Sequence, residues 1–413
     1  MTREMIQLSP RGKVIYQFLS LTVLLLPLYG LGFLLSALIT LPEPPLADVI
    51  SAAAIKQFTA RMFNLLCLTG FISAGFMMAD DTLNEEAIRR WLRAWSALVA
   101  LTLALSPFEI ELLLDSAIAM LLLVLLTWSW RAFANSSFVR VWQAGLLLSA
   151  ISLPAAQFAS GGAAIAISAF RVNVAFALCA LSIAFWLRPR YSSIESESAE
   201  ESLRLAAVLL CFGGGLISLG RLELPEFIGL SAAALIVLCY LILAGNLARS
   251  LRDRGEDASL APHWIALATL FWLVGGGLLG ALTIQDGVGR ATGQTDVSAA
   301  QAWLGNWVIV SILLAFSNET ATALRGDNRR VTGYVPLWLI AFGAGLSFIA
   351  QLCRGVAQFI LREYAPDASV GELDLLLPIT VVWIICLLAA TAGIAAYTLG
   401  FYLRRPEIHV VER

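Results

Sequence analysis

Long apolar stretches follow one another along the whole chain and are separated by short polar segments. Most of them reach the roughly 20 residues that an α-helix needs to cross a bilayer. The expected fold class is therefore all-α, a polytopic bundle of twelve transmembrane helices. The expected spans are 14–41, 58–78, 91–107, 109–131, 138–160, 163–187, 204–221, 226–248, 263–284, 298–324, 334–363 and 377–403.

The segments between the spans are too short to hold an independent soluble domain, so residues 1–413 are expected to form one integral-membrane domain. One polar connector contains Ser192, Ser193 and the alternating acidic and serine residues that follow. We interpret 188–203 as an acidic, solvated cytoplasmic loop, because such a composition cannot bury apolar surface. A regulatory or docking role for this loop is the alternative.

Basic residues favour one side of the predicted bundle. If the N-terminus is cytoplasmic, 20 of the 27 Lys and Arg residues lie on the inner side, and the few outer ones include Lys56, Arg61, Arg221, Arg290 and Arg362. Lys and Arg are enriched in cytoplasmic loops of membrane proteins. The charge pattern therefore predicts two cytoplasmic ends and an integral protein of a membrane such as the bacterial inner membrane.

Composition excludes several other classes. The chain is 59% hydrophobic and 14% charged, whereas soluble proteins have about 45–50% apolar and about 25% charged residues. The net charge of -2 offers no basic footprint for nucleic acid, and no phosphate-binding glycine motif is present. The triplets Gly213–Gly215 and Gly275–Gly277 lie within spans and indicate close helix packing.

Metal-ligating residues are scarce. The chain has two histidines, His263 and His409, which the predicted topology places far from any shared buried site. All six cysteines fall within spans, and none forms CxxC or CxxCH. We interpret them as small packing residues, with a thiolate metal site as the alternative.

Polar and charged side chains recur within the outer halves of several spans. Ionisable groups at membrane depth are costly and usually face the interior of a bundle. The candidate buried polar layer consists of Arg171, Asn173, Gln301, Asn306, Gln351 and Arg354. A functional polar cavity and a structural network that fixes neighbouring helices both explain this layer.

The arginines of this region need partners. Arg61 and Arg221 stand near span ends, where their side chains are expected to extend to the outer headgroups. Arg171 and Arg354 are deeper, and the carboxylates closest to them by depth are Glu223, Glu226 and Asp115.

Several local patterns occur in the order found in one known family. They are Ala180 to Arg190 at the end of the sixth span, the turn Leu222 to Ile228, the segment Thr295 to Leu304, and the span Trp338 to Leu361. Together they resemble subunit I of the heme–copper oxidase superfamily, in particular its nitric-oxide-reductase-like and high-affinity oxidase branches. The resemblance covers most of the chain and implies a twelve-helix bundle.

The same resemblance assigns histidine ligands for two hemes and a copper ion to positions that hold other residues here. The family's helix-two heme ligand corresponds to Asn64, its copper histidine to Ala169, and its His-x-His motif to Gln301 and Trp303. These side chains do not replace imidazole at heme iron. The chain is thus expected to lack heme b and copper, with Trp303, Phe170 and arginine side chains filling the space; a bound lipid or quinone stays open.

Three functions are compatible with these residues. The first is a non-catalytic, oxidase-like membrane subunit that scaffolds or regulates a respiratory complex with other membrane subunits. The second is a transporter or channel for a small polar or anionic solute, which Arg171, Arg354, Gln301 and Asn306 would hold. The third is an active terminal-oxidase or nitric-oxide-reductase type oxidoreductase with unusual cofactor ligands, the only case in which the chain itself is catalytic.

Overall fold

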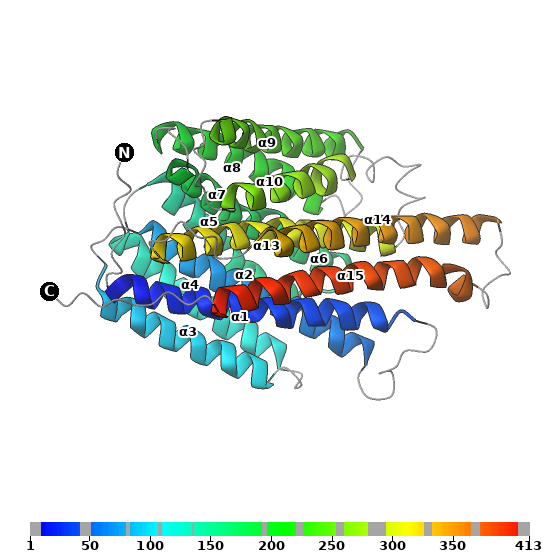
Figure 1. The fold of residues 1–413 in the computed structure, drawn as a ribbon, viewed down its shortest axis with the longest axis horizontal. Helices are drawn as coiled ribbons and strands as arrows, with labels where there is room; N and C mark the ends of the chain where they lie inside the picture. The colour runs from blue at the N-terminus through cyan, green and yellow to red at the C-terminus, as the bar shows by residue number, and fades with distance from the viewer. Residues whose placement is uncertain are drawn as a thin grey trace.

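The computed structural model is a bundle of long helices (Figure 1), and it describes residues 10–41, 51–79, 83–105, 110–133, 136–191, 196–219, 226–252, 260–279, 295–325, 333–364 and 372–403. No strand is present in these ranges. The helices are α1 (Pro10–Leu38), α2 (Ala52–Met78), α3 (Glu85–Leu105), α4 (Glu111–Ala132), α5 (Ser137–Phe158), α6 (Gly161–Phe170), η1 (Arg171–Phe176), α7 (Ala177–Tyr191), α8 (Ser196–Leu219), α9 (Glu226–Arg252), α10 (Ala261–Trp272), η3 (Leu273–Leu279), α13 (Thr295–Arg325), α14 (Tyr334–Tyr364) and α15 (Glu372–Leu403).

Within the described residues, nine helices are long and apolar enough to cross a membrane. They include the continuous rod of α6, η1 and α7, which spans Gly161–Arg188. The expected spans near α3, α10 with η3, and α13 are helical too, but do not join the nine. Helix α3 buries Ile88, Trp95, Val99 and Thr102 along one face and carries arginines elsewhere on its first turns. The apolar helix that begins at Ala261 is too short in the described residues to cross a membrane.

The surface of the bundle is strongly apolar. Large hydrophobic side chains such as Leu113, Met120, Phe158, Phe212 and Phe227 are more than half exposed on the helices that bear them. An apolar surface of this extent marks contact with a membrane rather than with water. The chain is an integral membrane protein whose outer face contacts the lipid bilayer.

The first and last helices meet at one end of the bundle. Tyr402 in α15 donates a hydrogen bond to the carbonyl of Ser20 in α1 at 2.5 Å. The rings of Tyr16 and Phe401 stack with centroids 5.3 Å apart. We call this the terminal end and the opposite one the distal end. At the distal end, the Ser36 and Thr59 hydroxyls of α1 and α2 lie 3.3 Å apart.

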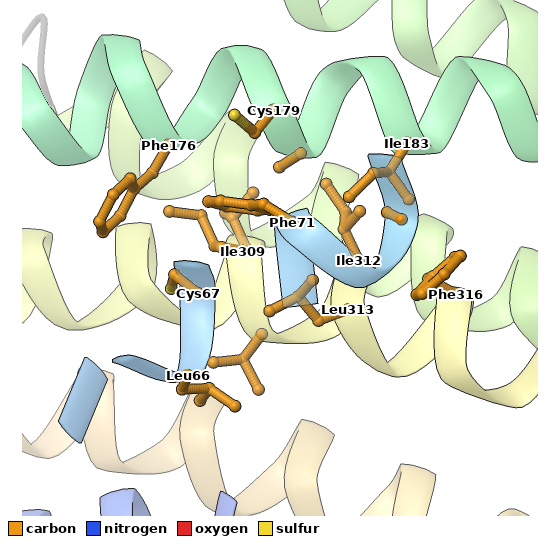
Figure 2. Close-up of a cluster of buried hydrophobic side chains, with 14 of the residues drawn as sticks. Leu66, Cys67, Phe71, Phe176, Cys179, Ile183, Ile309, Ile312, Leu313 and Phe316 are labelled. Carbon is orange, nitrogen blue, oxygen red and sulfur yellow. The ribbon is translucent and has the colours of Figure 1, made fainter. Parts of the chain in front are cut away.

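The second helix lies at the centre of the core. In the apolar stretch of α2, 89% of the residues are buried, whereas 39–56% are buried in the corresponding stretches of the other eight spans. Leu66, Cys67 and Phe71 of α2 interdigitate with side chains from η1, α7 and α13, as Figure 2 shows. This core occupies the middle of the bundle and leaves the first turns of α2 and α13 beside a different, more polar region.

The expected loop at 188–203 is shorter than the sequence suggested, because residues 188–191 end α7 and residues 196–203 form the first turns of α8. Ala199 and Leu203 are fully buried there. Glu200 accepts a hydrogen bond from the Ser137 backbone N–H at 3.1 Å, at the start of α5. Apolar residues spaced four apart therefore continue the helix into a segment whose acidic composition indicated a loop.

The interpretation of the first glycine triplet is confirmed for two of its members. A Cβ on Gly213 would meet the Ala232 carbonyl of α9 at 2.9 Å, and one on Gly214 would meet the Asn173 carbonyl of η1 at 2.8 Å. Helix α8 is thus held closely against both neighbours, one of which lines the site described next.

Candidate functional site

A cavity of about 810 Å³ lies in the distal half of the bundle. It is bounded by α1, α2, the α6–η1 segment, α8, α9, α10, α13, α14 and α15. Cavities of 300–1,000 Å³ are the size that holds small ligands and cofactors in proteins. Its polar lining residues are Tyr29, Ser36, Thr40, Lys56, Thr59, Asn64, Ser168, Arg171, Asn173, Tyr240, Asn306 and Gln351.

The structure brings most of the sequence-predicted site residues to this one cavity. Arg171, Asn173, Asn306 and Gln351, four of the six members of the candidate polar layer, line it. Three positions to which the oxidase resemblance assigns histidine ligands line it as well, namely Asn64, Ala169 and Trp303. Arg354 is buried one turn beyond Gln351 and is not among the lining residues. The side chain of Gln301 lies outside the described residues.

A π-helical turn contributes three of the lining residues. The rod that begins with α6 widens into the π-helix η1 over Arg171–Phe176 before α7 continues. Such π-helical turns are rare and frequently occur at functional sites. Arg171, Val172 and Asn173 are consecutive in this turn and all three line the cavity, so the start of the π-helical turn itself forms part of the wall.

Trp303 forms one wall of the cavity and is held firmly. Its indole N–H donates to Ser347 Oγ at 2.8 Å and to the Ala344 carbonyl at 3.2 Å, both in α14. Its ring packs edge-on against Phe33, with centroids 4.1 Å apart. Trp303 thus occupies a position that the resemblance assigns to a heme ligand and ties three helices together there.

The expectation that Trp303, Phe170 and arginine side chains fill this space is wrong. Trp303 is directed against α1 and α14, and Phe170 packs against the surrounding core. The distal half therefore keeps a cavity of about 810 Å³.

Charged side chains pair beside the cavity. Arg61 Nη2 in α2 lies 3.2 Å from Glu111 Oε1 in α4, and only 9% of the Arg61 side chain is exposed. Asp115 in α4 accepts a hydrogen bond from Gln157 in α5 at 2.8 Å. Its charge also interacts with Arg171 and Arg61. Asp115 is thus one of the charged partners that Arg171 was expected to need.

The expectation that Arg61 extends to the headgroups is wrong, because its guanidinium turns inward to Glu111. Sequence reasoning did not identify Glu111, since it stands at the start of a span, where an acidic residue is unremarkable. For Arg354, the guanidinium carbon lies 5.7 Å from the ring centroid of Trp383. Arg221 and Glu223 and the side chain of Glu226 lie outside the described residues.

Sequence reasoning also missed several lining residues. Tyr29, Tyr240 and Trp383 line the cavity, yet no motif or spacing distinguishes them from other residues of apolar spans. Lys56, which precedes the expected span 58–78, lines the cavity as well. Their convergence depends on how the helices are rotated, which one sequence does not specify.

The donor set of the cavity does not fit two hemes and a copper ion. Heme iron in proteins is held mainly by histidine, cysteine, methionine or tyrosine. The described lining residues include no histidine, cysteine, aspartate, glutamate or methionine, and their two tyrosines, Tyr29 and Tyr240, are too few to ligate two hemes and a copper ion. In the described part of the chain no three His, Cys, Asp or Glu side chains are grouped so that they could hold a metal ion. His263 packs against Tyr334 at the terminal end, with ring centroids 5.6 Å apart.

The fold and the cavity together define a helical integral membrane protein with an intramembrane cavity lined by aromatic, amide and cationic side chains. In comparisons with known proteins, no family model matches the chain, and no curated protein matches it significantly.

Proposed function

We propose that this chain is a non-catalytic, oxidase subunit I-like membrane protein that scaffolds or regulates a respiratory electron-transfer complex. One observation carries the proposal. Asn64, Ala169 and Trp303 come from three separate helices, and the oxidase resemblance assigns a metal or heme ligand to each position. All three line one cavity of cofactor size, whose lining lacks the family's ligands.

The proposal is tested by purifying the tagged full-length chain from its native membrane in a mild detergent. A complex with other membrane subunits is expected on a native gel, with no stoichiometric heme b band in the reduced-minus-oxidised spectrum of the isolated chain. A stoichiometric heme b signal contradicts the non-catalytic role and favours an oxidoreductase with unusual ligands. Migration of the chain by itself contradicts the subunit role.

The proposed orientation has the terminal end in the cytoplasm of a bacterium, with the cavity in the outer half of the inner membrane. The charges support it, because Arg89, Arg90 and Arg93 of α3 and Arg204 of α8 lie near the terminal ends of their helices. A reporter enzyme that is active only in the periplasm, fused after residue 403, is expected to be inactive. Activity of that fusion would reverse the orientation.

The second candidate function is transport of a small polar or anionic solute. The observation that favours it is the pair of cationic side chains, Lys56 and Arg171, that line the cavity without a lining carboxylate in the described residues. Vesicles that contain the chain are expected to take up such a solute, and Arg171→Ala and Arg354→Ala are each expected to abolish this uptake. Uptake that survives both substitutions removes this candidate site.

A further inference from the structure

The cavity walls carry buried polar atoms that have no hydrogen-bond partner within the described part of the chain. They include Tyr240 Oη, Gln351 Oε1, Trp383 Nε1 and Arg171 Nε. Tyr240 is 1% exposed, and Gln351 and Trp383 are each 8% exposed. Buried polar groups are almost always hydrogen-bonded, and an unsatisfied one costs about 1–3 kcal/mol. Each of these atoms has less than 1 Å² of accessible surface, so a ligand in the cavity reaches it only after its side chain turns toward the cavity, a change that the cost of leaving the atom unpaired favours.

The hydrogen-bonding capacity of these atoms indicates which polar groups a bound molecule must supply. The Trp383 and Arg171 atoms are donors only, and Tyr240 can also donate, so three of the four atoms need acceptor oxygens, whereas Gln351 Oε1 needs a donor. Arg171 and Arg61 are balanced by Asp115 and Glu111, and Lys56 at the cavity rim adds one further positive charge. Since no lining carboxylate opposes it in the described residues, the site favours a single negative charge.

The remaining wall residues indicate that the body of the ligand is apolar. Phe33, Phe63, Phe271, Trp272 and Trp303 line the cavity, and aromatic walls bind apolar chains and flat rings. Lys56 and Asn64 are eight residues apart on α2, which places them about 12 Å apart along the helix axis. The cavity thus runs inward from a charged rim at the distal end, long enough for an elongated ligand.

We propose that this cavity is a binding site for an amphipathic monocarboxylate, with its carboxylate near Arg171 and Lys56 and its apolar body against the aromatic walls. Such a molecule is either a fatty acid taken from the membrane or an aromatic carboxylate taken from solution. The inference goes beyond the proposed subunit function and does not depend on it, because the isolated chain is expected to bind.

The test uses calorimetric titration of the full chain in lipid nanodiscs, with protein-free nanodiscs as the background. Octanoate and octanol form one matched pair of probes, and naphthoate and naphthalenemethanol form the other. At least one carboxylate is expected to bind about tenfold more tightly than its alcohol, which is the effect of a hydrogen bond to a charged group. Tighter binding of octanoate points to a fatty acid from the membrane, and tighter binding of naphthoate points to an aromatic carboxylate from solution.

Substitutions inside and outside the cavity test whether the carboxylate binds there. Arg171→Gln is expected to weaken carboxylate binding about tenfold, and Ala169→Leu is expected to block it by filling the cavity without changing a charge. Arg93→Gln, an exposed arginine of α3 near the terminal end, is the matched control and is expected to have no effect. If Arg171→Gln does not fold, Lys56→Gln at the exposed rim provides the charge test.

Three results overturn the proposal. They are equal affinity for carboxylate and alcohol, no binding of any of the four probes, and carboxylate binding that Ala169→Leu leaves unchanged. None of these results bears on whether the chain purifies with other subunits, so this inference and the proposed function fail separately.

Discussion

The indole nitrogen of Trp303 donates to the hydroxyl of Ser347 across the contact between α13 and α14, at a distance of 2.8 Å. This bond holds the aromatic ring at the cavity wall, where it also contacts Phe33 of α1. The wall of the cavity is therefore fixed by a buried polar bond, and not by apolar packing alone.

Trp303→Phe is expected to lower the stability of the chain by about 1–3 kcal/mol, because Ser347 and the Ala344 carbonyl lose a buried donor. Trp307→Phe is the matched control, since Trp307 is equally buried and its indole nitrogen has no hydrogen-bond partner in the described residues. Thermal unfolding of both variants in one detergent measures the difference. Equal losses would show that the Trp303 bond contributes nothing to stability.

The pair Arg61 and Glu111 joins α2 to α4 beside the cavity, with 9% and 23% of the two side chains exposed. Glu111→Gln is expected to destabilise the chain by about 2–3 kcal/mol, less than for a fully buried pair, because it leaves the Arg61 charge poorly compensated. Unfolding in denaturant at constant detergent measures the loss.

The control for this pair is Arg90→Gln, which breaks the exposed Arg90–Glu86 pair, where the side chains are 73% and 66% exposed. Exposed ion pairs contribute little to stability, so no measurable change is expected. A loss from Glu111→Gln as small as that from Arg90→Gln would mean that the Arg61 pair is as well solvated as a surface pair.

The placement of Arg171 and Trp303 beside one cavity illustrates what the sequence could predict. Both residues fall in the outer halves of their expected spans, and depth can be read from the count of residues between span ends. The contact of Arg61 with Glu111 could not be predicted in this way, because it depends on the rotation of α2 and α4 about their axes. The same holds for Tyr240 and Trp383, which line the cavity from otherwise ordinary apolar helices.

The start of α8 shows a second limit. Composition indicated a solvated loop over 196–203, yet Ala199 and Leu203 are buried against neighbouring helices. Glu200 meanwhile satisfies the Ser137 N–H and contacts Arg204 at 3.4 Å. Tertiary packing thus decides the state of a segment in which acidic and apolar residues alternate.

The first turn of α3 is expected to respond to acid. The hydrogen bond and the charge of Arg90 lower the pKa of Glu86 below its ordinary value of 4.5. A carboxyl whose folded pKa is lowered contributes stability that is present above pH 4.5 and is lost as the pH falls through the folded pKa. Carbon NMR of glutamate-labelled protein is expected to show this lowered pKa for Glu86. Arg90→Gln should return it toward 4.5, and an unchanged pKa in that variant would assign the shift to another neighbour.

Gly343 of α14 lies directly against the backbone of α15. A Cβ at this position would come within 2.8 Å of both the Ala390 Cα and the Cys386 carbonyl oxygen. Backbone atoms cannot move aside as the end of a side chain can, so Gly343→Val is expected to separate α14 from α15 and cost about 1–3 kcal/mol or more. Because Gln351 and Trp383 line the cavity from these two helices, the variant should also weaken ligand binding there.

Gly345→Ala is the matched control, since the nearest atom to its Cβ, in Phe271, is 3.9 Å away. Thermal unfolding and carboxylate titration of the two variants check the expectation, and a Gly343→Val protein that unfolds and binds like Gly345→Ala would contradict the close contact.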